Sequence, residues 1–528
     1  MRAASVLSAL HFAVVATAAL TLPPRVETTS GPVLGFTTDH GGTAFVGIPF
    51  ARALRWGPPR PPESWIAPLN ATTPLPGCFP FNAIGGIEDC LVANVWLPAV
   101  PTAGRPLIVW IHGGGFVAGS GTGDFSLFAA GTGAVVVALN YRLGALGFLA
   151  LEGFAPAYPT PAAPDAACAN VGLLDQQAGL LWASANAAAF GADPAAVLLM
   201  GESAGGSSVL FHLSALRTSF PAYRAALAAS PAAFTNSLAG GRAIAAAIAA
   251  ELGCPAAAGA AAQLACMRAA PPAAVTAAAL VATNTSFLPL RLGPVVDGAL
   301  VSAVPALAIF SGAFNTNASV LVTTDAFEGD KLLFGFAGAV TLTPAAAAAA
   351  LAQFGLQEGL DGATTARLGA AYSPRAARDG AFTGSSRLWG DGLITCGASW
   401  AARGAAAQAR RAPHRMLWNA TFNTTRNVSF PEQPAGRPTH GSELSILFSG
   451  AAGAAATDAW TWLANAAVTG DVNAGAAGPP RVRWPAYETF RDILVVNERA
   501  EYTRVDTWQE DFCDTLWLPL VEAAAAAA

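Results

Sequence analysis

Short, mostly apolar runs recur between residues 107 and 496, and each is only four to six residues long. Runs of this kind predict strands buried on both faces, which is typical of a parallel sheet covered by helices. Between two of them, apolar residues recur at helical spacing over 171–190, and Gly191 is well placed to end that helix. Strand and helix therefore alternate, which predicts an α/β fold with a central, mostly parallel sheet flanked by helices. The runs are residues 107–111 (LIVWI), 134–139 (AVVVAL), 197–200 (VLLM), 319–323 (SVLVT) and 493–496 (ILVV).

No feature of the sequence divides the chain into separate domains. Its 528 residues allow about three domains by length. However, the sequence contains no internal repeat and no charged or Pro/Ser-rich linker. Pro- and Gly-rich stretches such as 56–62 and 470–483 are interpreted as loop excursions from one large unit. We therefore expect a single large domain.

The charge balance excludes several classes of protein. Lys and Arg number 28 against 33 Asp and Glu, a net charge of −5, and only 12 % of residues are charged while 53 % are hydrophobic. Disordered chains show the opposite balance. The weak negative charge provides no basic surface for nucleic acid or for an anionic membrane. The classes of protein that remain are an enzyme acting on a small molecule and a protein-binding domain.

The N-terminus has the pattern of an export signal. Arg2 precedes an apolar run over 6–20 that ends in small residues, as a signal-peptidase site requires. The alternative is a membrane anchor, but the run is shorter than the roughly 18 apolar residues of a span. We expect a signal peptide at 1–19, a folded domain at 20–522 and a poly-Ala tail at 523–528. No later segment resembles a membrane span, so we expect a secreted protein without a stable membrane anchor.

Seven cysteines fit an oxidising compartment. Counting alone leaves 105 possible pairings with one cysteine left over. Spacing narrows these, because Cys78 and Cys90 flank one short loop and Cys254 and Cys266 flank another. Zinc is the alternative, but the sequence has no C-x-x-C or H-x-x-x-H pair. Six Asn-x-Ser/Thr sequons fit a glycosylated secreted surface: Asn70, Asn284, Asn317, Asn419, Asn423 and Asn427.

A candidate nucleophile follows the run at 197–200. That run continues directly into Gly201-Glu202-Ser203-Ala204-Gly205-Gly206, and then into a helical stretch at 207–216. Glycines on both sides let the backbone turn so tightly that the serine is strained and exposed at the edge of the sheet. The pattern G-x-S-x-G is expected about 0.3 times by chance in such a chain. The strand–turn–helix context therefore carries the inference that Ser203 is a nucleophile.

A second glycine motif follows the run at 107–111. His112-Gly113-Gly114-Gly115-Phe116 can point successive N–H groups at one oxygen, as stabilisation of a tetrahedral oxyanion requires. The N–H after the serine would supply a further donor. The alternative is a nucleotide loop, since Gly113, Gly115 and Ala118 fit a loose G-x-G-x-x-A. The glycine-rich stretch that follows cannot form the helix that such a loop requires, and no acid lies about 20 residues on.

A nucleophilic serine needs a histidine as its base. In a fold of this kind the three residues occur along the chain in the order serine, acid, histidine. Three of the six histidines precede the serine: His11, His40 and His112. His212 lies nine residues after Ser203 on the same helix and is expected to pack. His414 lies among arginines, which suggests a surface position. His440 is followed by a polar loop, and we predict that it is the base.

The acid is sought between the serine and the histidine. Asp325, Glu328 and Asp330 follow the run at 319–323. Glu328 is best placed, because α/β sheets collect catalytic groups at the carboxyl ends of their strands. It would hold the second imidazole N–H and stabilise the imidazolium. The alternative is that all three are solvated loop acids.

Together these motifs resemble the type-B carboxylesterases, which include cholinesterases, liver-type carboxylesterases and some fungal lipases. The resemblance spans about residues 28–518. It implies an α/β-hydrolase fold with a triad of Ser203, Glu328 and His440. It also implies oxyanion donors from Gly114, Gly115 and Ala204, and the bridges Cys78–Cys90, Cys254–Cys266 and Cys396–Cys513, with Cys168 unpaired. The matching segments are Glu88-Asp89-Cys90-Leu91 with Asn94, 112–116, 170–176, 201–206, Val295-Val296-Asp297-Gly298, Glu328-Gly329 and His440-Gly441.

Departures from the family pattern concern the acid loop and the substrate. The family acid usually occurs as D-E-G, whereas here Ala326-Phe327 separate Asp325 from Glu328. Cholinesterases carry a choline-stacking tryptophan in the loop closed by the first bridge, and residues 79–89 contain none. Leu288 and Leu290 occur where cholinesterases have acyl-pocket aromatics, which suggests room for longer acyl chains. Both substrate features point away from choline esters.

The sequence therefore predicts a secreted serine hydrolase that cleaves a small-molecule ester or a lipid through an acyl-enzyme, without a cofactor or a metal. A lipase acting on long-chain acylglycerols is the alternative among enzymes. The alternative from another class is a catalytically inactive, cholinesterase-like adhesion protein. Such proteins lack triad members and tend to carry a membrane-spanning tail, neither of which describes this sequence.

Overall fold

The structure is a computed structural model. It describes residues 22–80, 85–100, 102–153, 168–215, 223–232, 235–283, 290–337, 342–358, 360–408, 413–419, 438–450, 453–475, 477–487, 493–497, 502–505, 513–520 and 522. The predicted signal peptide at 1–19 and the tail at 523–528 lie outside these residues. So do Leu288, Asn284, Asn423 and Asn427, and the side chain of Leu290.

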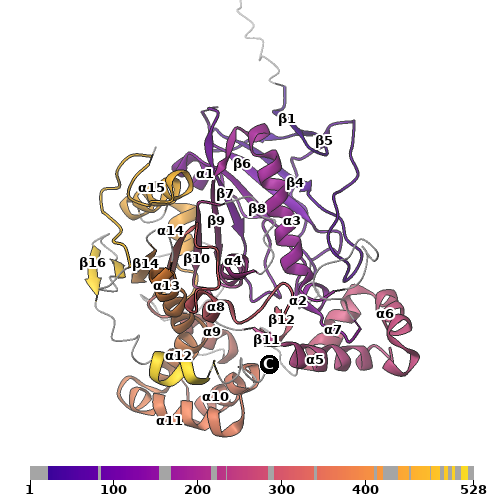
Figure 1. Cartoon of the computed structure of the whole chain (residues 1–528), viewed down its shortest axis with the longest axis vertical. Helices are drawn as coiled ribbons and strands as arrows, with labels where there is room; N and C mark the ends of the chain where they lie inside the picture. Colours follow the sequence, from indigo (N-terminus) through magenta and orange to yellow (C-terminus); the bar gives the residue numbers. More distant parts are fainter. Residues whose placement is uncertain are drawn as a thin grey trace, which may run out of the picture.

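A large twisted sheet of eleven strands forms the centre of the described chain (Figure 1). Its strands lie in the order β16 (Tyr502–Val505), β15 (Ile493–Asn497), β14 (His414–Asn419), β13 (Ser319–Asp325), β10 (Ala225–Ala229), β9 (Ala192–Glu202), β7 (Arg105–Ile111), β8 (Val135–Leu139), β6 (Val92–Leu97), β4 (Thr43–Pro49) and β3 (Phe36–Thr37). Neighbouring strands from β15 to β8 are parallel, and the pairs at both edges are antiparallel. The expected central, mostly parallel sheet is confirmed.

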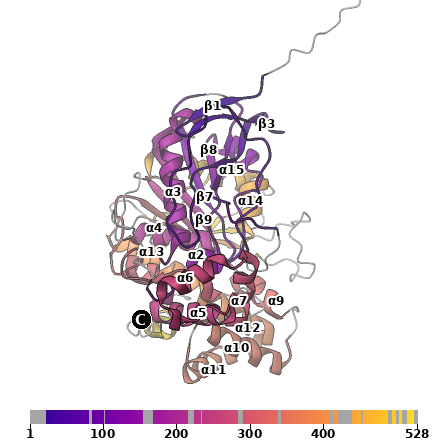
Figure 2. The same ribbon diagram turned by 90° about the vertical axis from the view of Figure 1, so that its right-hand side faces the viewer.

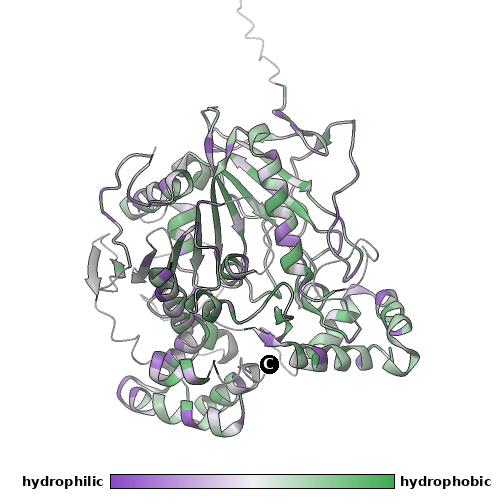
Figure 3. Cartoon of the chain, viewed as in Figure 1, coloured by the Kyte–Doolittle hydropathy of each residue, from purple (hydrophilic) through white to green (hydrophobic). Residues whose placement is uncertain are grey.

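Helices cover both faces of the sheet, because its central strands are apolar on both sides (Figure 3). Val109 of β7 packs in the core that includes residues of α3 and α4, and its neighbour Ile108 packs in the core that includes residues of α15. One face carries α3 (Val171–Asn186), α4 (Ala204–Ser214), α8 (Pro305–Phe310) and α13 (Cys396–Gln408). The other carries α1 (Ser126–Thr132), α14 (Glu443–Ser449) and α15 (Ala454–Thr469).

Two further groups of helices lie beyond the ends of the central strands, at the bottom of Figure 1 and of the turned view in Figure 2. One contains α9 (Glu328–Ala337), α10 (Pro344–Glu358), α11 (Gly362–Asp379) and α12 (Ala381–Gly390), and the other α2 (Gly144–Phe148), α5 (Leu238–Glu251), α6 (Ala260–Ala269) and α7 (Pro272–Thr283). Short strands form two small sheets: β1 (Arg25–Thr28), β2 (Gly31–Leu34) and β5 (Leu69–Asn70), and β11 (Asn236–Ser237) with β12 (Val295–Val296).

Three disulfide bonds join the pairs that the family resemblance implies. Cys78–Cys90 and Cys254–Cys266 each close a span of 12 residues, and Cys396–Cys513 closes one of 117. Cys168 is buried and free. Within the described residues, no individual helix is long and apolar enough to span a membrane. Only α6 and α7 taken together are, and the two helices meet at a bend of 114°.

Three details differ from the sequence-based expectations. Strand β9 begins at Ala192, before the apolar run at 197–200, and so includes Asp193 and Pro194; the proline is tolerated beside an irregularity in the pairing with β7. Helix α4 begins at Ala204 rather than at 207, because the chain reverses within a single residue. The expected surface position of His414 is wrong. It is buried on the interior strand β14, where Nδ1 lies 2.9 Å from the Pro485 carbonyl oxygen.

Candidate active site

Ser203 occupies a sharp turn between β9 and α4. Its φ of 56° and ψ of −120° lie in a strained region for a residue with a side chain. The turn is held because the Ser203 N–H donates to the Ala229 carbonyl oxygen at 2.9 Å. It also needs glycine nearby: a Cβ on Gly205 would lie 2.0 Å from the Ile111 carbonyl oxygen. This is the geometry of a nucleophile elbow, which exposes a hydroxyl at the carboxyl end of the strand.

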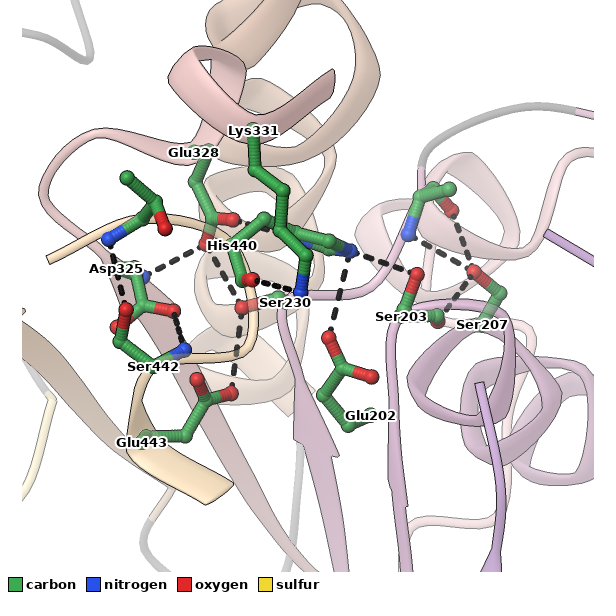
Figure 4. A network of polar contacts seen from close by, with 12 residues as sticks. Glu202, Ser203, Ser207, Ser230, Asp325, Glu328, Lys331, His440, Ser442 and Glu443 are labelled. Atoms are coloured by element: carbon green, nitrogen blue, oxygen red, sulfur yellow. Dashed lines mark hydrogen bonds and ion pairs between the residues drawn. The ribbon is translucent and has the colours of Figure 1, made fainter. Parts of the chain in front are cut away.

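A continuous chain of hydrogen bonds links the three residues that the sequence singles out (Figure 4). The Ser203 Oγ lies 2.7 Å from Nε2 of His440, and Nδ1 of His440 lies 2.6 Å from Oε2 of Glu328. The ionised Glu328 can only accept, so Nδ1 carries the ring hydrogen and Nε2 of the neutral ring accepts from the serine. Such an arrangement can remove the serine proton while the carboxylate stabilises the resulting imidazolium.

Glu328 is fixed by two donors besides the imidazole. Its Oε1 accepts from the Asp325 N–H at 2.7 Å and from the Ser230 hydroxyl at 2.8 Å. It is the first residue of α9, where the helix dipole favours a negative charge. Asp325, Glu328 and Asp330 are each no more than 2 % exposed, so the alternative of three solvated loop acids is wrong.

The acid loop and the base loop are joined directly. The Phe327 N–H donates to the Pro438 carbonyl oxygen at 3.0 Å, and Phe327 forms an isolated parallel bridge with Thr439. Lys331 Nζ donates to the carbonyl oxygen of His440 at 3.0 Å. Two extra residues in the acid loop relative to D-E-G are therefore accommodated, with Phe327 paired to the segment that leads into His440.

Glu202, to which no sequence motif assigns a role of its own, is a second carboxylate at the imidazole. Its Oε1 lies 3.3 Å from Nε2 of His440, the same nitrogen that contacts Ser203. Burial raises the pKa of Glu202, whereas the charges of His440 and Lys331 pull it down. The one signal in the sequence is that Glu202 directly precedes the serine. As the last residue of β9, it lies at the end of the strand that faces the imidazole.

The carboxylates also set the proton affinity of the ring. Burial alone would lower the pKa of His440, but the negative charges of Glu202 and Glu328 outweigh it and raise that pKa above its ordinary value. The imidazolium formed when the ring takes a proton is therefore stabilised inside the site. The base remains neutral, and hence competent, only above the raised pKa.

The glycine motif after β7 lies beside the serine. Gly114 and Gly115 adopt φ values of 106° and 64°, and Ala204 begins α4. Among the described residues, the N–H groups of these three donate to no protein acceptor. They are therefore available to an oxyanion, and their role as its donors stays a prediction.

The residues around this motif hold it against the elbow. Tyr141 stacks on His112 with ring centroids 4.4 Å apart, and its hydroxyl donates to the His112 carbonyl oxygen at 3.0 Å. Burial lowers the pKa of His112 to about 4, so this ring stays neutral. His212, as expected, packs in the interior: its Nε2 lies 2.9 Å from Oε1 of Gln176.

Within the described part of the chain, no three His, Cys, Asp or Glu side chains are grouped so that they could hold a metal ion. The acyl-pocket prediction for Leu288 and Leu290 falls on side chains outside the described residues. Of the sequons, Asn70 and Asn317 are exposed.

A mainly parallel sheet with a serine on a strand–helix elbow, followed in chain order by an acid and a histidine, defines an α/β-hydrolase. The comparison with known families agrees: the model of the carboxylesterase family matches residues 22–492, and the chain belongs to that family, whose type-B members it resembles.

Named relatives include an acetylcholinesterase from Gallus gallus, 37 % identical over 318 residues, which are 54 % of this chain and 40 % of the relative. A para-nitrobenzyl esterase from Bacillus subtilis is 42 % identical over 200 residues, covering 35 % of this chain and 39 % of the relative. An acetylcholinesterase from Bungarus fasciatus is 33 % identical over 345 residues, covering 60 % and 55 %. The matched part thus spans about two fifths to just over half of each relative.

Proposed function

We propose that the protein is a secreted serine hydrolase that cleaves carboxylic esters through an acyl-enzyme, with Ser203, His440 and Glu328 as its triad. Ser203 Oγ attacks the ester carbonyl carbon while its proton passes to Nε2 of His440. The negative charge that develops on the carbonyl oxygen is stabilised by the N–H groups of Gly114, Gly115 and Ala204. The proton then moves to the departing alkoxide as the ester C–O bond breaks.

The acyl-enzyme is released by the same groups. His440 takes a proton from water, the resulting hydroxide adds to the acyl carbon, and Ser203 Oγ leaves with the proton returned from Nε2. Glu328 keeps the imidazole in the required tautomer throughout. The observation that carries this function is the unbroken hydrogen-bond chain from Ser203 to Glu328 on a strained elbow.

The substrate and the location are inferred from weaker features. The absence of tryptophan from residues 79–89 supports an ester without a quaternary ammonium group. The names of the relatives include both cholinesterases and a para-nitrobenzyl esterase, so the family accommodates different alcohol groups. Three disulfide bonds support export into an oxidising compartment.

Replacement of the nucleophile tests the function. Ser203→Ala should lower p-nitrophenyl ester turnover by roughly 10³- to 10⁶-fold and abolish organophosphate labelling, with an unchanged melting temperature. Ser214→Ala is the matched control, because Ser214 lies at the far end of α4 and only donates within the helix, to Leu210 at 2.8 Å. Labelling that persists in Ser203→Ala would refute the nucleophile. In the wild type, a series of esters of increasing acyl length, assayed below and above micelle formation, separates an esterase from a lipase.

A further inference from the structure

Two buried carboxyl groups lie beside the triad without taking part in it. Asp325 ends β13, and Glu443 begins α14 and is fully buried. One oxygen of each, Oδ1 of Asp325 and Oε2 of Glu443, has no hydrogen-bond partner in the described part of the chain. The two groups lie near each other, because Asp325 Oδ2 accepts from the N–H of Ser442, the residue directly before Glu443, and each carboxyl group shifts the pKa of the other. A buried carboxylate oxygen without a donor costs free energy of folding, and a proton bound by the pair would remove this cost.

The side chain of each member also contacts a residue that holds part of the triad in place: Ser442 for Asp325 and Ser230 for Glu443 (Figure 4). Asp325 Oδ2 accepts from the Ser442 N–H at 3.1 Å, and the Ser442 hydroxyl accepts from the Thr439 N–H at 2.8 Å. These two bonds fix the turn that carries His440. Glu443 Oε1 lies 3.5 Å from the Ser230 hydroxyl, which donates to Glu328 over the shorter distance of 2.8 Å.

The charges around the pair oppose its full ionisation. Asp325 faces the carboxylates of Glu443 and Glu328, and Glu443 faces those of Glu202 and Glu328; only Asp325 and His440 act to lower the pKa of Glu443. Burial, followed by the neighbouring carboxylates, raises the pKa of Asp325 well above its usual range, and burial raises the pKa of Glu443 to about 7. Two carboxyl groups that share one site in this way keep a proton, and they titrate as a pair.

We propose that Asp325 and Glu443 hold one proton between Oδ1 and Oε2, and that this acid pair positions the turn that carries His440. The proton satisfies both unpaired oxygens and leaves a single negative charge on the pair, so that Asp325 can still accept from Ser442. Loss of the proton at alkaline pH places two carboxylates against each other and draws Ser442, and with it His440, away from Ser203. The positioning role rests on the proposed function, whereas the shared proton does not.

Infrared difference spectroscopy tests the proton without any turnover. At pH 7 the wild type should show the carbonyl absorption of a protonated carboxyl group. Asp325→Asn should lose it, because the amide supplies the donor and Glu443 then ionises. Glu202→Gln is the matched control and should keep the absorption, although it too removes a buried acid beside His440. An absorption absent from the wild type, or unchanged in Asp325→Asn, would overturn the proposal.

Kinetics test the positioning role separately. Asparagine at 325 still accepts from the Ser442 N–H, whereas Asp325→Leu leaves that donor unsatisfied. Asp325→Asn should therefore keep a kcat about tenfold higher than Asp325→Leu at similar KM, and its activity should extend to higher pH than that of the wild type. Equal kcat values and unchanged pH profiles for the two variants would overturn the positioning role. A wild type that cleaves no ester but shows the expected infrared changes would refute only the proposed function.

Discussion

Lys331 donates from its ammonium group to the main-chain oxygen of His440 at 3.0 Å. It is the only lysine in 528 residues, in a chain that otherwise uses arginine for every basic group besides histidine. Its positive charge also lowers the pKa of two neighbouring groups, the Glu202 carboxyl and the His440 imidazole. A compact ammonium group reaches this enclosed position without the broad fork of a guanidinium.

Removing that charge should make the enzyme less active in mild acid. In Lys331→Met the pKa of His440 rises further, because the cation that opposed protonation is gone. The base is competent only when neutral, so the acidic limb of kcat/KM against pH should move to higher pH. Lys331→Arg retains the charge and is the control. An acidic limb that moves equally in both variants would show that the charge is not the cause.

Glu202→Gln should move the same limb in the opposite direction. The charge of the Glu202 carboxylate is the largest single cause that raises the pKa of His440, and glutamine removes this charge while keeping the size of the side chain. In the wild type the limb should lie above pH 6.5, the ordinary value for histidine, and in Glu202→Gln it should lie lower. A flat wild-type profile down to pH 4 would rule out His440 as the base.

Glu328→Gln should lower kcat by roughly 10³- to 10⁴-fold although it changes few atoms. Both donors to Oε1, the Asp325 N–H and the Ser230 hydroxyl, require an oxygen there. The amide nitrogen must therefore face Nδ1 of His440, which forces the ring hydrogen onto Nε2, where it cannot accept the serine proton. Melting temperature serves as the control. A loss below about tenfold would contradict this tautomer argument.

Gly113→Ala should disrupt the site although glycine and alanine differ by one methyl group. The added Cβ would lie 2.6 Å from Oε2 of Glu202 and 3.0 Å from Cβ of Ser203. Displacing the oxyanion loop or the elbow should lower kcat/KM by about 10²-fold or more. Gly362→Ala, at the start of α11, places its Cβ in open space and should leave activity unchanged.

The long disulfide should contribute more to stability than either short one. By loop entropy, a bridge that spans about 100 residues stabilises by about 4.7 kcal/mol, against about 3 kcal/mol for one that closes about 15. Cys396→Ala/Cys513→Ala should therefore lower the free energy of unfolding, measured by urea titration, more than Cys254→Ala/Cys266→Ala. Equal losses would contradict the entropic account.

The sequence predicts five of the seven parallel strands from β15 to β8, because strands buried on both faces leave continuous apolar runs. It misses β10, which is almost entirely alanine, and β14, which begins with His414 and Arg415. The antiparallel edge gives no such signal. Strand β4 contains Gly47 and ends at Pro49, two residues that weaken a strand pattern, and it forms through its pairing with β6.

The residues of the site also differ in how well the sequence predicts them. Ser203 and His440 were singled out by motif, chain order and elimination, and the structure places them 2.7 Å apart. No motif points to Glu202 or Glu443, and Asp325 is only one of three candidates for the acid, because acidic residues are usually exposed and only tertiary structure shows that these are buried. Three chain segments far apart in the sequence enclose them together, and no local pattern records that enclosure.

The bridge between Phe327 and Thr439 has a consequence for biosynthesis. Ser203 and His440 are separated by 237 positions, and the acid loop between them is held in place by the segment that immediately precedes the histidine. Since a nascent chain emerges from the N-terminus, the elbow and its glycine loop can form while the base is still inside the ribosome. Hydrolytic activity should therefore be absent throughout most of synthesis and arise only when about the last sixth of the chain, which carries His440, docks against the acid loop.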